Sequence, residues 1–293
     1  MRTDRLLHIT LRAGTVRVLM CDVTRAAREA RIVHGASRVC SAALGRGIAG
    51  AALLNAPRKG ERLTLTFRGD GPAGALVAVA GPGVLKATID NPSVELPLKP
   101  NGKLDVGGAI GGEGRVIVVR DMALKQPYVG QSALVSGELA EDLAMYCTVS
   151  EQQPTLCALG VKLGMLDGAE EVIAAGGLMI QPLPGCPEET LAALELRQEL
   201  FADISSAIEH EELETLAVQF FDGLAPEILQ VESLEYQCDC GRARMEKALI
   251  AMGRDELTSL IQDQGGAELV CHFCRSAYAF SESDLRELLA SAR

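Results

Sequence analysis

Two close cysteine pairs near the end of the chain most constrain how it can fold. Cys238 and Cys240 are separated by one residue, Cys271 and Cys274 by two, and 30 residues lie between the pairs. A fold that brings both pairs together forms a four-thiolate tetrahedral site, the geometry of structural zinc, with Zn–S distances of about 2.3 Å. The C-x2-C-x2-C run of iron–sulfur proteins is absent from the sequence. We therefore predict one Zn²⁺ per chain, with Cys238, Cys240, Cys271 and Cys274 as its ligands.

The spacing leaves two interpretations of this site open. Most four-cysteine zinc sites are structural, so a zinc ribbon that only folds the C-terminal residues would explain the pattern. However, C-x-C is unusual in ribbons, and a disulfide within it would close a strained, easily reduced ring, as a reversible redox switch requires. His272 lies between two cysteines that complete the ligand set, so we interpret it as a surface histidine.

The rest of the chain favours a reduced, cytoplasmic environment. The N-terminal stretch "MRTDRLLHITLRAG" carries charges where a signal peptide would be apolar, and Arg46 interrupts the longest low-charge run, residues 40–57. Nine cysteines in such a compartment indicate metal or redox chemistry. Of the five cysteines outside the two pairs, we expect four to be small buried residues: Cys21, Cys40, Cys147 and Cys157. Cys186 lies in a predicted loop and is expected to be exposed and unpaired.

Residues 1–182 are predicted to form an α+β domain with a mainly antiparallel sheet. Alternating apolar residues and the turn at Gly69–Pro72 indicate hairpins, which favour antiparallel pairing. The expected strands are 5–12, 15–23, two within 62–81, 84–90, 104–110, 115–121, 155–163 and 172–181, and the expected helices are 24–34, 39–54 and one within 136–150 with Ser136 as a possible N-cap. The Gly-rich stretch 107–114 is interpreted as a loop, because it lacks the Lys-Ser/Thr of a phosphate-binding loop.

Residues 183–233 are predicted to be an acidic helical linker that begins after the breakers in "QPLPGCP". Between Pro187 and Glu232 there are twelve carboxylates and one arginine, a net charge of −11 that equals the formal charge of the whole chain. Like charges at helical spacing destabilise a helix by a few tenths of a kcal/mol per pair. Such a segment is expected to stay helical only while its apolar face is docked, although an ordinary solvated acidic helix would fit the same pattern.

Residues 234–293 are predicted to form a small zinc-binding domain. Two apolar helical faces end at Gly253 and at Gly265, a knuckle between short strands follows, and Ser281 with Asp284 matches a capping box before a last helix. A unit of this size has a small hydrophobic core and needs a metal ion or disulfides to stabilise its fold.

The sequence offers little support for an enzyme or a nucleic-acid-binding protein. It contains no G-x-S-x-G or H-E-x-x-H motif, and "CHFC" is followed by a predicted strand where a thioredoxin-type motif needs a helix. An acidic protein without a basic stripe is a poor ligand for nucleic acid. A zinc-ribbon binding module and a thiol oxidoreductase remain as alternatives.

Several stretches resemble the redox-regulated holdase chaperones of the heat shock protein 33 family, nearly from end to end. They include "AALGRGIAGAALL", "LTLTFRGDGPAGALVAVA", "LDVGGAIG", "QPYVGQSALVSGELAEDLAMYCTVSEQQPTLCALGV", "AAGGLMIQPLPG" and "CDC" with "CHFCRSAYAF". Gly241 and Arg275, which follow the two pairs, depart from the family pattern without altering a ligand.

The resemblance implies a chaperone that is inactive while its four cysteines bind zinc in the reduced state. Oxidation would form the disulfides Cys238–Cys240 and Cys271–Cys274, release zinc and unfold residues 183–233 with the C-terminal domain. The exposed apolar surface would then hold unfolding client proteins without ATP, and the active form would be a homodimer. These implications predict no enzymatic activity, no membrane and no nucleic acid as partner.

Overall fold

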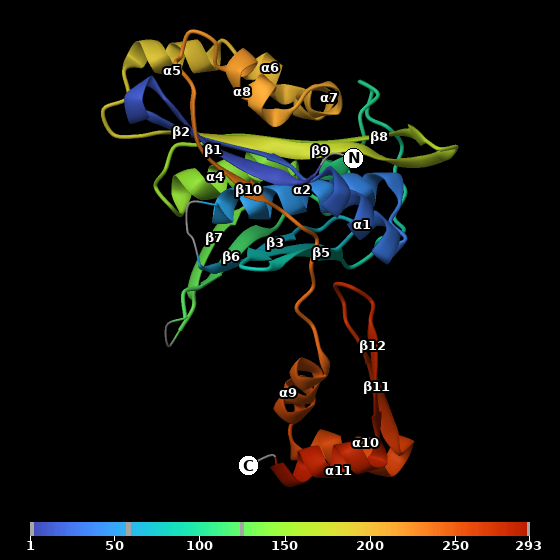
Figure 1. Ribbon diagram of the computed structural model, residues 1–293. Coiled ribbons are helices and arrows are strands. Elements are labelled where there is room, and N and C mark those ends of the chain that lie inside the picture. Colours follow the sequence, from blue (N-terminus) through green and yellow to red (C-terminus); the bar gives the residue numbers. More distant parts are fainter. Residues whose placement is uncertain (1–2, 57–59, 124–125, 292–293) are drawn as a thin grey trace. The chain divides into compact units, whose positions relative to one another are not determined.

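The protein, described by a computed structural model over residues 3–56, 60–123 and 126–291, divides into two compact units, Met1–Gln237 and Cys238–Arg293 (Figure 1). The acidic segment 183–233 therefore packs as part of the first unit. Across the described residues, no helix is both long enough and apolar enough to cross a membrane.

The first unit contains a five-stranded antiparallel sheet, sheet A, built from residues far apart in the sequence. Its order is β10-β1-β2-β9-β8, with β10 and β8 as edge strands. The strands are β1 (Arg5–Leu11), β2 (Val16–Asp22), β8 (Leu156–Leu166), β9 (Ala169–Pro182) and β10 (Glu227–Ser233). The turn between β1 and β2 is the short helix η1 (Arg12–Gly14), where Ala13 adopts φ 54°. The predicted strands over 5–12 and 15–23 are therefore confirmed, and they pair with each other.

A second five-stranded antiparallel sheet, sheet B, has the order β5-β4-β3-β6-β7. Its strands are β3 (Arg62–Arg68), β4 (Ala75–Gly81), β5 (Val84–Ile89), β6 (Arg115–Asp121) and β7 (Tyr128–Ala133). Each pairing in both sheets is antiparallel, which confirms the predicted α+β class.

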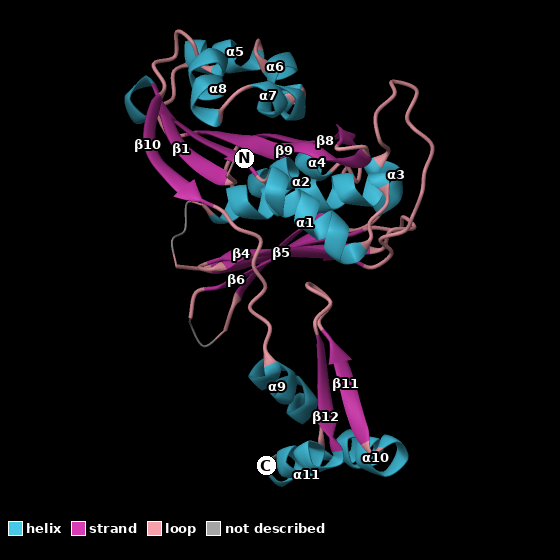
Figure 2. Cartoon of the chain, turned by 45° about the vertical axis from the view of Figure 1, so that its right-hand side comes forward, coloured by secondary structure: helices cyan, strands magenta, loops and turns pink. Residues whose placement is uncertain are grey.

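Helices fill the space between the two sheets (Figure 2). They are α1 (Thr24–His34), α2 (Arg38–Asn55), α3 (Val106–Ile110) and α4 (Leu139–Val149). Fifteen of the 18 residues of α2 are buried, so this helix is enclosed on nearly every side. Its small residues make this possible, since a Cβ added at Gly45 would lie 2.7 Å from Val161 Cγ2, and one at Gly47 would lie 2.9 Å from Leu76 Cδ2.

Four short helices of the acidic segment cover the opposite face of sheet A (Figures 1 and 2). They are α5 (Glu188–Glu195), α6 (Gln198–Ala202), α7 (Ile204–His210) and α8 (Leu213–Phe220). Their apolar residues, including Phe201, Ile208 and Leu216, form one buried cluster with β1, β2 and β9. The predicted docked arrangement is therefore present, although residues 227–233 of the predicted helical linker form strand β10.

The second unit is small. It consists of α9 (Arg242–Met252), α10 (Arg254–Gln264), β11 (Gly266–Val270), β12 (Ala277–Ser281) and α11 (Glu282–Ser291). Among its described residues, five buried side chains make its core: Leu249, Leu257, Ile261, Phe280 and Leu285. The predicted capping box is confirmed, because Ser281 N donates to Asp284 Oδ2 at 2.8 Å and Asp284 N donates to Ser281 Oγ at 3.2 Å.

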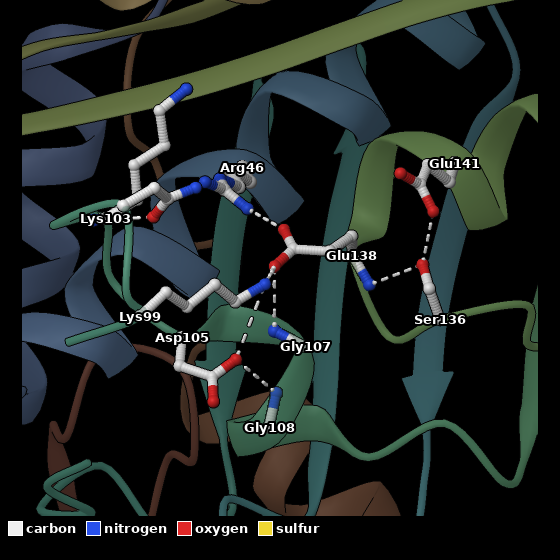
Figure 3. Close-up of polar contacts among 10 residues, drawn as sticks. Arg46, Lys99, Lys103, Asp105, Gly107, Gly108, Ser136, Glu138 and Glu141 are labelled. Carbon is white, nitrogen blue, oxygen red and sulfur yellow. Dashed lines mark hydrogen bonds and ion pairs between the residues drawn. The ribbon is translucent and has the colours of Figure 1, made fainter. Parts of the chain in front are cut away.

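Glu138, at the start of α4, connects several segments of the first unit and accounts for two wrong predictions (Figure 3). Its carboxylate accepts hydrogen bonds from Arg46 Nη1 at 2.5 Å, Lys99 Nζ at 2.5 Å and Gly107 N at 3.2 Å. Asp105 accepts a hydrogen bond from Gly108 N at 2.9 Å, and the two carboxylates together stabilise helix α3. The predicted strand over 104–110 and the predicted loop over 107–114 are therefore wrong where they overlap α3.

The predicted N-cap of α4 is also wrong. Ser136 lies two residues too early, and Glu138 is the N-cap residue. The Ser136 hydroxyl instead accepts from Glu138 N at 3.2 Å and donates to Glu141 at 2.6 Å, which fixes the chain as it enters the helix.

Candidate metal centre

The two cysteine pairs come together at one end of the β11–β12 hairpin. Cys238 and Cys240 lie just before α9, Cys271 follows β11, and Cys274 lies in the turn that leads to β12. All four Sγ atoms lie within 4.8 Å of one another. The structure thus brings the four predicted ligands to one place, as the spacing required.

The sulfur geometry fits a tetrahedral metal ion. Four sulfurs at the usual Zn–S distance lie about 3.8 Å apart. Cys238 Sγ and Cys271 Sγ are 3.8 Å apart, and Cys240 Sγ and Cys274 Sγ are 3.2 Å apart. Each of these contacts joins one cysteine of the first pair to one of the second, which is the arrangement that a shared ion would stabilise.

The turn that carries the second pair is held by backbone contacts. Cys271 N donates to Ser276 O at 2.9 Å, and Arg275 N donates to Cys271 O at 2.9 Å. Arg275 adopts φ 59° at the point where the chain reverses. Its role in the structure is therefore to close the knuckle.

Two hydroxyl groups that the sequence analysis missed contact the sulfurs. The Tyr278 hydroxyl lies 3.1 Å from Cys240 Sγ, and the Ser276 hydroxyl lies 3.3 Å from Cys274 Sγ. No spacing rule identifies Tyr278, because its hydroxyl reaches Cys240 only through the β11–β12 register, in which Tyr278 pairs with Leu269.

Hydrogen bonding sets the ionisation of these sulfurs. Burial raises the pKa of Cys274, but hydrogen bonds with Ser276, Cys240 and Cys271 outweigh it and bring that pKa to about 6. A thiol with such a pKa is a thiolate at neutral pH, the form that binds metals and reacts with oxidants. Burial instead raises the pKa of Cys240, and the bond to Cys240 raises the pKa of Tyr278 to about 12, so the tyrosine remains a hydrogen-bond donor.

The other sulfur and imidazole groups lie outside this cluster. His272 is exposed, as predicted. Cys21, Cys40 and Cys147 are buried, as predicted, whereas Cys157 is only partly buried, as is Cys186 in its loop. Burial raises the pKa of Cys21, Cys40, Cys147 and Cys157, which makes these thiols poor nucleophiles.

The chain just before the first cysteine pair is anchored to sheet B. Tyr236 is 8% exposed, and its hydroxyl donates to Ala87 O at 3.3 Å. Gln237 forms an isolated antiparallel bridge with Leu85 through two backbone hydrogen bonds, of 2.8 and 3.2 Å. This anchor lies between β10 and Cys238 in the sequence.

Basic side chains from outside the acidic segment neutralise part of its charge. Arg5 binds Glu212 and, at 2.9 Å, Glu214. Lys162 binds Glu209 at 2.5 Å. The His8 ring adds a polar contact of 3.1 Å between its Nε2 and Glu232 Oε1. These partners come from distant residues, so the single arginine counted within the segment does not give all of its ion pairs.

Comparison with known proteins gives one consistent result. The sequence profile of a family described as "Hsp33 protein" matches residues 4–281. A "33 kDa chaperonin" of Ruminiclostridium cellulolyticum is 40% identical, with 98% of each chain covered, and one of Enterococcus faecalis is 40% identical, with 97% and 96% covered. A crystal structure of the 33 kDa chaperonin (heat shock protein 33 homolog) of Thermotoga maritima is similar with a TM-score of 0.88 and 34% identity, over 99% of each chain.

Proposed function

The chain belongs to the Hsp33 family, and we propose that it is a redox-regulated, ATP-independent holdase chaperone. In this proposal the reduced protein binds one Zn²⁺ through Cys238, Cys240, Cys271 and Cys274 and is inactive. The observation that supports it best is the convergence of those four sulfurs within 4.8 Å.

Oxidation is proposed to remove the metal ligands. Each cysteine pair, Cys238–Cys240 and Cys271–Cys274, loses two electrons and forms one S–S bond, while a peroxide takes up those electrons and two protons and is reduced to two waters. The sulfurs in a disulfide can no longer hold the ion. Bound zinc contributes about 10–16 kcal/mol to the folding of small domains, and the second unit has only five buried core side chains, so it is expected to unfold.

Unfolding is proposed to spread from Cys238 through the Tyr236 anchor to the acidic segment, residues 183–233. That segment covers apolar side chains of sheet A such as Leu7, Ile9 and Val18. Their exposure would create a surface for unfolded client proteins. In this scheme 1–182 is the client-binding and dimerisation domain, 183–233 the releasable linker and 234–293 the redox switch.

The remaining parts of the proposal concern context. We expect a cytoplasmic protein that forms a homodimer when oxidised, with no enzymatic activity and no nucleic acid or membrane as partner. A zinc-ribbon module without redox switching is the alternative, and a thiol oxidoreductase is the less favoured one.

One experiment tests the proposal. Reduced protein is treated with hydrogen peroxide at raised temperature while zinc release, far-UV circular dichroism and light scattering of a heated client are recorded. We expect one zinc per chain to be released, helical signal to fall and client scattering to be suppressed, equally in wild type and in Cys186→Ser. Oxidised, zinc-free protein that does not slow scattering would contradict the proposal. Retention of zinc under oxidant would favour the structural alternative, and catalytic turnover of a disulfide substrate would favour the oxidoreductase.

A further inference from the structure

Strand β10 occupies the edge of sheet A beside β1, and nothing continues the sheet beyond it within the described residues. The register pairs Arg5 with Ser233, Leu7 with Val231 and His8 with Gln230, and then shifts by a bulge before Ile9 pairs with Ile228. Two further backbone bonds flank the pairing: Arg12 N donates to Leu224 O at 3.0 Å, and Leu234 N donates to Asp4 O at 2.9 Å.

The two paired strands differ sharply in burial. In β1, the side chains of Leu6, Leu7, Ile9 and Leu11 are at most 1% exposed. In β10, Ile228, Leu229 and Val231 are 36, 63 and 51% exposed. β1 is therefore fixed by packing on both faces, whereas β10 is attached mainly along its backbone and belongs to the segment that the proposed function releases.

The departure of β10 would leave β1 as an edge strand. Its outward N–H and C=O groups would then lack partners, and such an edge pairs readily with another extended chain. Leu7 and Ile9 point to the face that α5–α8 cover. Residues directly opposite each other in an antiparallel pair share a face of the sheet. In a strand that replaces β10, the side chains opposite Leu7 and Ile9 would therefore lie on the face of sheet A that α5–α8 cover. In the structure these are Val231 and Ile228.

We propose that the edge of β1, residues 5–11, is the site that captures clients in the oxidised protein, by adding an extended client segment to sheet A in the register that β10 vacates. This inference rests on the proposed function. The partner is an unfolded polypeptide segment with free backbone amides and apolar, preferably β-branched, side chains on one face, as in "EILQVES" of β10 itself. In the reduced protein β10 occupies the site and blocks it.

An edge strand of sheet B with comparable exposure would not be opened and closed in this way. Strand β7 is an edge of sheet B, and its Tyr128 and Val129 are already 42 and 57% exposed while α5–α8 are docked. A capture site at β7 would be open in the reduced protein as well. This makes β7 a matched control site.

Peptide competition tests the backbone pairing. A synthetic peptide of residues 226–234 is compared with two N-methylated isomers, one methylated at Gln230 and Glu232 and the other at Val231 and Ser233, as competitors for a fluorescent unfolded client on the oxidised protein. Alternate amides in this regular part of the register point toward β1 and away from it. We therefore expect the unmodified peptide and one isomer to compete, and the other isomer to lose at least tenfold in competition.

The outcomes separate the inference from the proposed function. Equal competition by both isomers, or no competition by any peptide while the oxidised protein still holds the client, overturns the β1 site alone. A failure of the oxidised protein to hold any client overturns the proposed function instead.

Site-specific cross-linking locates the bound client independently. The photoreactive residue p-benzoylphenylalanine is placed at His8 on β1 or at Val129 on β7, and thermal unfolding of the reduced variants verifies that the first unit is folded. We expect oxidised protein to cross-link the client from position 8 and not from position 129. Cross-linking from position 129 equally with, or in place of, position 8 overturns the inference.

Discussion

Lys162 on β8 donates a 2.5 Å hydrogen bond to Glu209 on α7, 47 residues further along the chain. This ion pair connects sheet A to the centre of the acidic segment, and Arg5 makes a similar connection to Glu214 at 2.9 Å. The segment that carries a charge equal to that of the whole protein is thus held partly by cations from residues 1–186. Docking of α5–α8 combines apolar burial with electrostatic attraction.

Removal of the Lys162 cation should loosen the docked acidic helices. The two side chains are 38 and 25% exposed, and exposed ion pairs contribute about 0.2–1 kcal/mol, so Lys162→Gln should raise the undocked population by at most about fivefold. Faster hydrogen exchange in α7 of the reduced, zinc-bound variant is the expected result. Lys103→Gln, at an exposed lysine of the same unit, is the control. Equal exchange in α7 of wild type and Lys162→Gln would show that burial alone holds the helix.

Local patterns predicted those parts of the fold in which neighbouring residues determine the structure. The β1–β2 hairpin, helices α1 and α2, and the Ser281–Asp284 capping box follow from alternation, helical spacing and capping rules. Helix α3 was missed although Asp105 caps it locally, because the second stabilising carboxylate, Glu138, lies 31 residues from Gly107. Strand β10 was missed for a similar reason, since its partner β1 lies more than 200 residues earlier.

The candidate site was predictable to the level of its four sulfurs. Cysteine spacing constrains metal geometry, so the sequence predicted that Cys238, Cys240, Cys271 and Cys274 come together, and their sulfurs lie within 4.8 Å of one another. The two hydroxyl groups that contact the sulfurs were not predicted, because the positions of Tyr278 and Ser276 depend on the register of the β11–β12 hairpin.

Asp4 should make the first unit less stable as pH rises. Its carboxylate is 3% exposed and accepts hydrogen bonds from Arg25 N at 2.9 Å and Ala26 N at 2.7 Å, at the start of α1. Burial raises its pKa from 3.8 to about 6, so the folded state binds a proton more tightly than the unfolded state does. Its contribution is fully present below pH 3.8 and is lost as pH rises through about 6.

Asp4→Asn removes this titration. The unfolding free energy of wild type minus that of Asp4→Asn should fall between pH 4 and pH 7, by at most about 3 kcal/mol. The measurement is denaturant unfolding of the first unit at several pH values in both proteins. A difference that stays constant over this range would refute the assignment to Asp4.

Gly45 is predicted to be intolerant of a side chain because α2 lies against both α1 and β8. A Cβ at this position would lie 2.7 Å from Val161 Cγ2 and 3.1 Å from Ala27 Cβ. Overpacking of this kind costs about 1–3 kcal/mol, so Gly45→Val should lower the thermal midpoint of the first unit by about 3–10 °C. Gly112→Val, where a Cβ would meet nothing within 4 Å, should leave the midpoint nearly unchanged. Equal midpoints for the two variants would mean that α2 can move away from its neighbours.

Loss of one sulfur should separate metal binding from redox chemistry. Cys274→Ser, kept in strong reductant so that no disulfide forms, lacks one of the four thiolates whose sulfurs cluster in the second unit. Three remaining ligands hold zinc more weakly, and a core of five buried side chains cannot compensate for a metal contribution of about 10–16 kcal/mol. We therefore expect a variant with less than one zinc per chain, reduced far-UV helical signal and fast hydrogen exchange in α10 and α11, while β3 and β4 remain protected. His272→Ala, at an exposed residue between two of the clustered cysteines, should retain one zinc and normal protection. Full zinc occupancy in Cys274→Ser would show that the ion does not need this thiolate as a ligand. Unchanged protection of α10 and α11 after a chelator removes zinc from the wild type would show that the ion does not stabilise this unit.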